Sequence, residues 1–169
     1  MKKVLLLLMV AMAGLAANAQ VYTGGSLSIW GSDGSHSFRL APEVGYNLSD
    51  QWAVAGTLLF EHAKSGGTKA TGFALAPYVR YTFLQNERVD LFVDGGIGFA
   101  TSKIKGASDR RNGFEFGFRP GLSIKATQRL SLVAKVGFLG YRDDYLNYSN
   151  GGGVSVSGED LSFGLYYSF

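Results

Sequence analysis

The end of the chain carries the feature that most restricts its fold. Over residues 161–169 apolar and small side chains alternate, with Tyr166 as the one even position that is not small, and the chain ends on a phenylalanine. The odd positions are all apolar or aromatic: Leu161, Phe163, Leu165, Tyr167 and Phe169. Such alternation predicts a β-strand with one apolar face. Because a terminus frays unless it is tied down, a strand of this kind is unusual at the end of a soluble protein.

This ending resembles the insertion signal of Gram-negative outer-membrane β-barrels, in which a terminal phenylalanine closes the last strand. The resemblance implies that the odd positions face lipid and the even positions face the lumen. It also implies recognition by the barrel assembly machinery, through Phe163, Leu165, Tyr167 and Phe169. The alternation alone leaves a second interpretation open, the last strand of a soluble sandwich or lipocalin-like barrel.

The first 19 residues have the composition of a secretory signal peptide. Lys2 and Lys3 form a basic start, residues 4–13 are apolar but too short to span a bilayer, and residues 17–19 read Ala-Asn-Ala. We therefore predict cleavage before Gln20 and a single mature domain over 20–169. An uncleaved anchor helix is the alternative. The chain has no cysteine, which excludes disulfides and lipid attachment at a cysteine.

The basic charge of the full chain is largely a property of this leader. Of the 16 Lys and Arg residues, Lys2 and Lys3 lie in it, which leaves 14 basic against 13 acidic residues. The mature chain is thus nearly neutral, and nucleic-acid binding is not expected. No second apolar stretch is long enough for a transmembrane helix.

Strand-like segments recur along the whole mature chain. Eight of them are predicted, at 21–31, 37–47, 52–62, 71–83, 90–102, 113–125, 130–142 and 159–169. Each is about as long as a tilted transmembrane strand needs to be, ~9–11 residues. An even number places the first and last strands side by side, so the sheet can close without an edge in hydrocarbon.

The connections between these segments alternate in length. Three are short, at 48–51, 84–89 and 126–129. The others are mostly longer and rich in Gly, Ser, Asp and Lys, at 32–36, 63–70, 103–112 and 143–158. Short periplasmic turns and longer external loops are typical of outer-membrane barrels, whereas a soluble barrel has no reason to sort its loops by end.

One face of the predicted strands is apolar along its whole length. Aromatic residues lie near the loop ends, at Phe38, Phe60, Phe73, Phe99, Phe114 and Phe138. Others lie near the turn ends, at Tyr46, Trp52, Tyr81, Tyr167 and Phe169. Aliphatic residues separate the two groups, including Leu40, Val54, Leu75, Val79, Ile97, Leu132 and Val136. Aromatic belts on both sides of an aliphatic band indicate a lipid-facing surface.

The opposite face carries charges of nearly balanced sign. Five are basic and four acidic: Arg39, Arg80, Arg119, Lys125 and Lys135, with Glu43, Glu61, Asp94 and Glu115. An unpaired charge in a low-dielectric interior is costly, so this pattern predicts a network of ion pairs in the lumen. An eight-stranded interior has room only for side chains or one small ligand, so a general pore is not expected.

A hairpin unit repeats within the chain. Residues 40–46 (LAPEVGY) are echoed at 75–81 (LAPYVRY) and more faintly at 118–124 (FRPGLSI). Each copy contains one proline, at Pro42, Pro77 and Pro120. Because proline cannot donate to a ladder, we predict a bulge or a weak ladder position at each.

These features together resemble the small outer-membrane β-barrel family that includes OmpX and the OmpA transmembrane domain, over residues 20–169. The resemblance implies an all-β, eight-stranded antiparallel up-and-down transmembrane β-barrel in the Gram-negative outer membrane. Its partners would be lipid and lipopolysaccharide, and a monomer is expected. It implies a structural, adhesion or stress-related role at the cell surface, with an extracellular ligand that the sequence does not identify.

An enzymatic alternative comes from two eight-stranded barrels that act on lipid A, the palmitoyltransferase PagP and the deacylase PagL. Both resemblances require a histidine and a serine near the outer rim. The candidates here are His36 beside Ser37, and His62 beside Glu61. A histidine with a hydroxyl or carboxylate can support nucleophilic or general-base chemistry. No further motif of either enzyme is present, so the competing interpretation is two polar rim residues.

The loop at 103–112 is a candidate for contact with lipopolysaccharide. It is basic, with one acid, Asp109, against Lys103, Lys105, Arg110 and Arg111. Side chains of this type hold phosphates by charge-assisted hydrogen bonds. The competing interpretation is a solvated loop.

The longest predicted loop, 143–158, is a candidate for a partner site. It holds Tyr145 and Tyr148 and then alternating valine and serine, which favours a β-ribbon with free backbone groups. A flexible glycine-rich loop is the alternative. With two histidines and no cysteine, no metal site is expected, and no cofactor motif is present.

Overall fold

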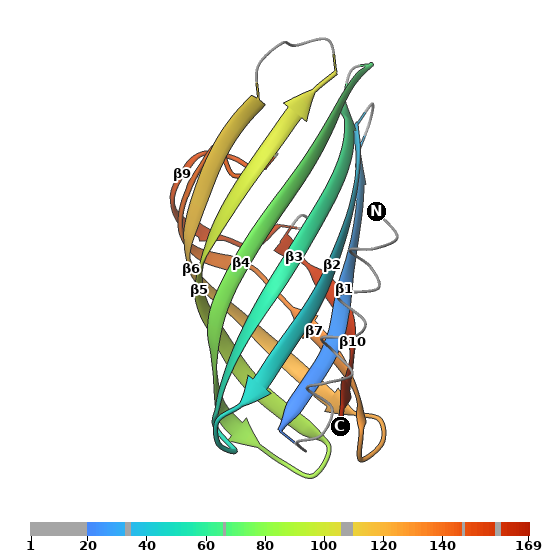
Figure 1. Ribbon diagram of the computed structural model, residues 1–169, viewed down its shortest axis with the longest axis vertical. Coiled ribbons are helices and arrows are strands. Elements are labelled where there is room, and N and C mark those ends of the chain that lie inside the picture. The colour runs from blue at the N-terminus through green and yellow to red at the C-terminus, as the bar shows by residue number, and fades with distance from the viewer. Residues whose placement is uncertain (1–19, 33–34, 66, 106–109, 147, 158–159) are drawn as a thin grey trace, which may run out of the picture.

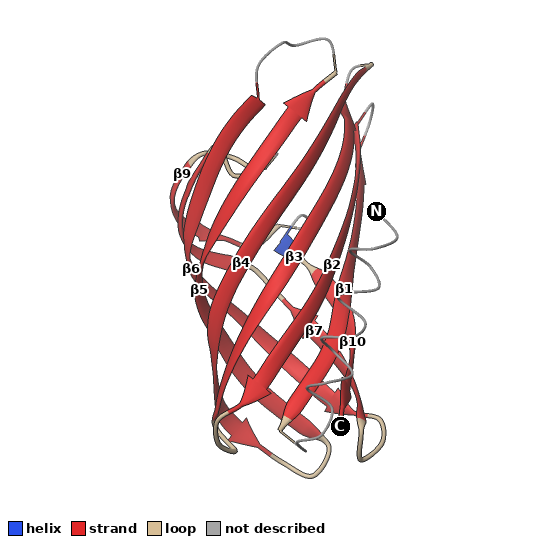
Figure 2. Ribbon diagram, viewed as in Figure 1, coloured by secondary structure: helices blue, strands red, loops and turns tan. Residues whose placement is uncertain are grey.

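The computed structural model describes residues 20–32, 35–65, 67–105, 110–146, 148–157 and 160–169. The predicted signal peptide and Asp109 lie outside the described residues. Figure 2 shows that the described chain is almost entirely strand, with short connections. Within these ranges, no helix has the length and apolar character needed to cross a membrane.

Ten strand segments form one antiparallel sheet that closes on itself. They are β1 (Val21–Ser32), β2 (Ser35–Asn47), β3 (Trp52–Ser65), β4 (Thr68–Gln85), β5 (Val89–Ile104), β6 (Arg110–Lys125), β7 (Leu130–Lys135), β8 (Phe138–Asp143), β9 (Gly151–Ser155) and β10 (Ser162–Ser168). β7 and β8 follow one another along β6, while β10 pairs with β7 and β9 with β8. The predicted eight-stranded antiparallel barrel is therefore confirmed.

The two ends of the sheet meet where β1 lies beside β10 (Figure 1). Tyr22 pairs with Ser168, and the pairing continues to Leu27 and Phe163. The Phe169 amide donates to the Val21 carbonyl at 3.1 Å, so the last residue of the chain completes the seam. We call this end of the barrel, with its three short turns, the turn end, and the opposite end the loop end.

The strands at the loop end are longer than predicted. β3 and β4 leave only residues 66–67 between them, and β1 and β2 leave only 33–34. The prediction of longer loops at 32–36 and 63–70 is therefore wrong. A ladder satisfies its own backbone groups whether or not its side chains are apolar, so polar hairpins extend beyond the apolar band.

The apolar face points outward, with one exception. The predicted belt residues other than Phe138 lie on the exposed face, as do the odd positions of β10. Phe138 is only 4% exposed and lies inside the barrel, so its assignment to the outer aromatic belt is wrong.

A one-residue bulge causes this exception. Gly137 lies between β7 and β8 with φ +74°, a conformation that favours glycine. The five residues from Lys135 to Leu139 span the same stretch of the barrel wall as only four residues of β6, from Gly121 back to Phe118. Since side chains alternate with a period of two, one extra residue exchanges the two faces beyond it. Phe138 and Arg142 therefore turn inward.

The prolines coincide with gaps in the hydrogen-bond ladder. Pairing with the next strand skips from Leu40 to Glu43 at Pro42, and in the same way at Pro77. At Pro120 the neighbouring strand carries the Gly137 bulge. This agrees with the weak ladder positions predicted from the missing donor of proline.

Candidate functional site

The lumen contains two layers of ion pairs. All nine charged residues predicted for it lie inside the barrel, and each has an oppositely charged partner within 4 Å. Seven of them are buried, whereas Arg119 and Lys125 are partly exposed. Three charged residues that were not predicted join them: Asp90, Arg142 and Asp160.

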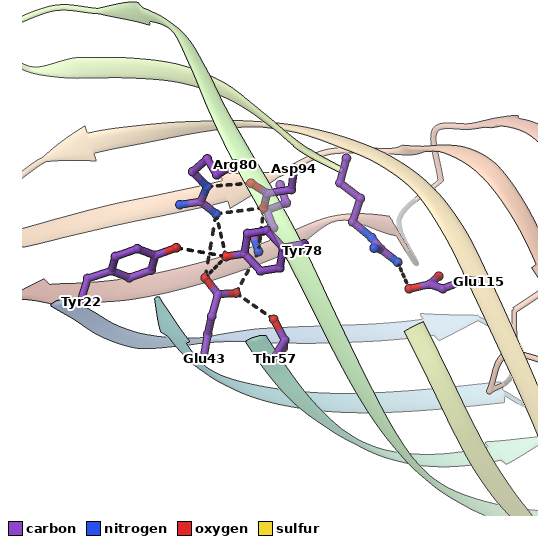
Figure 3. Close-up of polar contacts among 9 residues, drawn as sticks. Tyr22, Glu43, Thr57, Tyr78, Arg80, Asp94 and Glu115 are labelled. Atoms are coloured by element: carbon purple, nitrogen blue, oxygen red, sulfur yellow. Dashed lines mark hydrogen bonds and ion pairs between the residues drawn. The ribbon is translucent and has the colours of Figure 1, made fainter. Parts of the chain in front are cut away.

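The first layer, which we call the inner charge layer, consists of Glu43, Tyr78, Arg80 and Asp94, which Figure 3 labels, together with Lys135. The Arg80 guanidinium donates to both carboxylate oxygens of Asp94, at 2.6 and 2.9 Å. Lys135 Nζ lies 3.0 Å from Glu43 and 3.1 Å from Asp94. The Tyr78 hydroxyl donates to Glu43. Two acids thus face two bases across the lumen, on strands that are all part of the closed barrel.

Aromatic rings cover the inner charge layer toward the turn end. The Arg80 guanidinium lies 3.8 Å above the centre of the Phe92 ring, and Tyr22 and Tyr166 stack at 5.6 Å. Beyond them lies a polar vestibule of about 390 Å³ that opens toward the turns. Lys125 and Asp90 pair at 2.8 Å at this end of the barrel.

The second layer, the outer charge layer, consists of Arg39, Glu61, Glu115, Arg119, Arg142 and Asp160. Arg39 pairs with Glu61 at 2.6 Å. Glu115 accepts from Arg119 at 2.6 Å and from Arg142 at 3.1 Å, and Arg142 also pairs with Asp160 at 2.8 Å. The layer is balanced by three bases and three acids. Without the bulge, sequence parity would place Arg142 on the lipid face, and for this reason it was missed.

Tyr145 and Tyr148 lie in the barrel, and not on its outside as predicted. Tyr145 is 0% exposed and packs against Ala74 and Ala100 on the inner wall. The Tyr148 ring has the Arg39 guanidinium 4.1 Å from its centre and the Arg142 guanidinium 4.0 Å from it. The prediction of an external contact at these tyrosines is wrong, because their rings find apolar and cationic partners inside.

Asp160 holds the connection between β9 and β10 against this layer. Burial raises the pKa of this carboxyl, but hydrogen bonds from Ser155 and Ser157 and the Arg142 guanidinium outweigh burial and lower it. A lowered pKa means that folding favours the ionised form. Its stabilising contribution is therefore present above the pKa of an unfolded aspartate and is lost as the pH falls through the lower folded value.

Between the two layers lies a small, partly enclosed chamber of about 90 Å³. Its walls include Ala76 and Thr57, and side chains of both charge layers face it. A chamber of this size holds a few water molecules. The described interior is thus closed by two successive layers of side chains.

The outward surface at the loop end carries a group of basic residues, which we call the cationic rim: Lys64, Lys69, Lys103, Lys105 and Arg110. Strand pairing places Lys64 opposite Lys69, and Lys103 opposite Arg110. All are exposed, and a hollow of about 280 Å³ lies beside Lys103 and Arg110. Arg111 lies on the same face of β6 as Glu115, which faces the lumen, and is therefore not part of this group.

The two histidines do not form the predicted pairs. His36 and Ser37 are consecutive in β2, and Glu61 and His62 are consecutive in β3. Consecutive side chains in a strand point to opposite faces. Glu61 faces the lumen, where it binds Arg39, so His62 faces outward. Among the described residues, no cluster of three or more His, Asp and Glu side chains could hold a metal ion.

Known proteins share this sequence pattern and fold. The sequence matches the family described as outer membrane protein beta-barrel domain over residues 4–169. No curated protein matches it. The structure is similar to that of Neisserial surface protein A, with 15% identity, a TM-score of 0.56, and coverage of 88% of this chain and 96% of that one.

Two further solved structures are similar. One is a major outer membrane protein from Thermus thermophilus, with 16% identity, a TM-score of 0.56, and coverage of 89% and 98%. The other is OprG from Pseudomonas aeruginosa, with 11% identity, a TM-score of 0.50, and coverage of 88% and 94%. At such identities the likeness concerns the fold alone.

Proposed function

Since the chain belongs to the outer membrane protein beta-barrel domain family and lies in the Gram-negative outer membrane, we propose that it is a non-enzymatic surface protein with two external contacts. The cationic rim binds lipopolysaccharide phosphates. The hairpin of β8 and β9 binds an extended segment of a protein partner.

The free edge of β9 is the observation that carries the second contact. Among the described residues β9 pairs with β8 alone, so its other edge has no strand partner. Val154 in β9 and Val156 just after it are 75% and 76% exposed. An unpaired edge with exposed apolar side chains is a surface on which an extended peptide adds a strand.

The test is the binding of the purified protein, in nanodiscs, to an array of immobilised peptides. We expect it to bind peptides in which apolar and polar residues alternate. Val154→Lys with Val156→Lys should abolish this binding, because charges on an edge strand oppose strand addition. The matched control, Asn86→Lys with Gln128→Lys at the turn end, adds the same charge and should bind like the parent. Equal binding by all three proteins would refute the β9 site.

The cationic rim supports the first contact. It lies on β3 to β6 above outward aromatic residues, with the Phe60 and Phe73 rings 5.2 Å apart just below it. Rings at the headgroup level place the rim where phosphates of the outer leaflet lie. Lys and Arg hold such phosphates by charge-assisted hydrogen bonds.

A triple variant, Lys103→Glu with Lys105→Glu and Arg110→Glu, tests this contact. We expect it to weaken association with lipopolysaccharide at least about ten-fold, because each basic residue near an anionic surface contributes about 1 kcal/mol to binding. The measurement is retention of added lipopolysaccharide by the protein in phosphatidylcholine nanodiscs, at two salt concentrations. Arg88→Glu with Arg129→Glu at the turn end is the control. Unchanged retention by the triple variant would argue for a merely solvated rim.

The geometry favours binding over lipid A chemistry. Neither histidine shares a strand face with its neighbouring serine or carboxylate, so the predicted pairs of His36 with Ser37 and of His62 with Glu61 do not supply the partner that acyl transfer or deacylation needs. Mass spectrometry of lipid A from expressing cells should show no acyl chain gained or lost. A change that reverts with His36→Ala or His62→Ala would overturn the proposal.

A further inference from the structure

The segment after β8 turns back into the barrel. Asp144 and Leu146 have φ values of 46° and 57°, in the left-handed region that residues other than glycine rarely adopt. Between them Tyr145 is completely buried. Such a backbone persists only where its surroundings hold it, so contacts inside the barrel keep this turn in place.

The inner wall of the barrel has a recess that fits this segment. A Cβ atom at Gly98 would lie 2.7 Å from the Tyr145 hydroxyl oxygen, and one at Gly72 would lie 2.4 Å from Leu146. At Gly113 it would lie 2.1 Å from the Asp144 carbonyl carbon. Each distance is shorter than a real contact allows. Glycines on three neighbouring strands thus leave the room that the inserted residues occupy.

The contacts that hold this segment differ from those of the inner charge layer. Tyr148 lies between two guanidiniums, and Arg142, on β8 of the same hairpin, binds Glu115 and Asp160. Among the described residues, strand pairing joins the hairpin to the rest of the sheet along β6 alone, and Gly137 lies at its base. The inner charge layer sits entirely on strands that are paired on both sides around the ring.

We propose that Tyr145, Leu146 and Tyr148 form a removable plug, and that its withdrawal with the β8–β9 hairpin opens the chamber between the charge layers toward the loop end. The inner charge layer remains in place and keeps the barrel closed. The protein thus alternates between a filled lumen and an outward-facing cavity, and does not become a channel. The inference rests on the lumen contacts and does not depend on the proposed partner or on lipopolysaccharide.

Single cysteines provide the test, because the chain has none of its own. Ala76→Cys places a thiol in the chamber, and Thr82→Cys places one in the vestibule, both on β4 but on opposite sides of the inner charge layer. In nanodiscs a small charged thiol reagent should label Thr82→Cys quickly in every background. It should label Ala76→Cys slowly, because labelling waits for a local opening.

Gly98→Leu fills the recess and should expel the plug. We expect it to accelerate labelling of Ala76→Cys about ten-fold or more, since the opening equilibrium no longer limits the rate. Gly56→Leu is the matched control, because nothing lies within 4 Å of a Cβ at Gly56, and it should change nothing. Planar-bilayer conductance should stay as low in Gly98→Leu as in the parent.

The double variant Tyr145→Ala with Tyr148→Ala is a second way to open the chamber, because it removes the rings of the plug without adding volume to the wall. It should also accelerate labelling of Ala76→Cys. Heat-modifiable migration on gels confirms that each variant is a folded barrel. Fast labelling of Ala76→Cys in the parent would overturn the proposal, because the chamber would then be open already. Slow labelling in both plug variants would overturn it as well. A steady channel in either variant would contradict the closed inner layer.

Discussion

Arg80→Ala is expected to lower the free energy of unfolding of the barrel by about 3–5 kcal/mol, because removing one partner of a buried ion pair leaves an uncompensated charge. Asp94 and Glu43 would then share Lys135 as their one base in the inner charge layer. Two carboxylates with one ammonium in a low-dielectric interior repel each other. The measurement is the urea midpoint of refolded protein in lipid vesicles, followed by tryptophan fluorescence.

Two variants separate charge from other effects of the change. Arg88→Ala removes an exposed arginine from a turn and should leave the midpoint unchanged. Arg80→Met with Asp94→Leu removes the bidentate pair as a whole and keeps the pair of Lys135 and Glu43. It should recover part of the loss, since a pair replaced by apolar groups leaves no lone charge. A parental midpoint for Arg80→Ala would mean that water, and not the ion-pair network, solvates the interior.

Deleting Phe169 is expected to reduce the amount of assembled protein in the outer membrane to a small fraction of the parental level. The Phe169 amide completes the ladder between β10 and β1, and its ring packs edge-on against Tyr167 at 5.2 Å. An incompletely closed seam leaves backbone groups unsatisfied in hydrocarbon. We also propose that the assembly machinery recognises the odd positions at the end of the chain, which are Phe163, Leu165 and Tyr167 in β10 and Phe169 after it.

The comparison is between Phe169→Ser and Phe99→Ser. Both remove an outward-facing aromatic ring, but Phe99 lies in the interior of β5. If the terminal residue is a signal, Phe169→Ser should deplete the assembled protein far more than Phe99→Ser, as measured by heat-modifiable migration of membrane fractions. Similar levels of the two variants would reduce Phe169 to an ordinary lipid-facing residue.

The strands, their faces and the lumen charges could be predicted because they depend on local pattern. A strand exposes alternate residues to lipid and to lumen, so each of Arg39, Glu43 and Arg80 reveals its side of the wall by parity alone. The turn ends could be predicted for the same reason, since the apolar band stops abruptly there. Asp90 and Asp160 share the parity of the lumen face, but neither was predicted to lie there.

The loop end could not be predicted in this way. Above the membrane a hairpin needs no apolar face, so the lengths of β3 and β4 leave no mark in the alternation. The plug was missed because Tyr145 follows two aspartates and precedes the glycines at 151–153, in a segment with the composition of a solvated loop. Its partners, Gly98 and Gly72, come from strands that are distant in sequence.

The sequence by itself thus determined the closed barrel, its membrane-facing band and the composition of its interior. Each follows from the two-residue period of side chains in a strand, and from the cost of leaving charges or backbone groups unpaired in a medium without water. Only the tertiary structure decided which charges pair, where Arg142 points and what fills the upper lumen. One bulge at Gly137 exchanges the faces of β8, and no local rule places such a residue. The pairing across the lumen and the docking of Tyr145 depend on the distances between strands, which exist only once the sheet has closed.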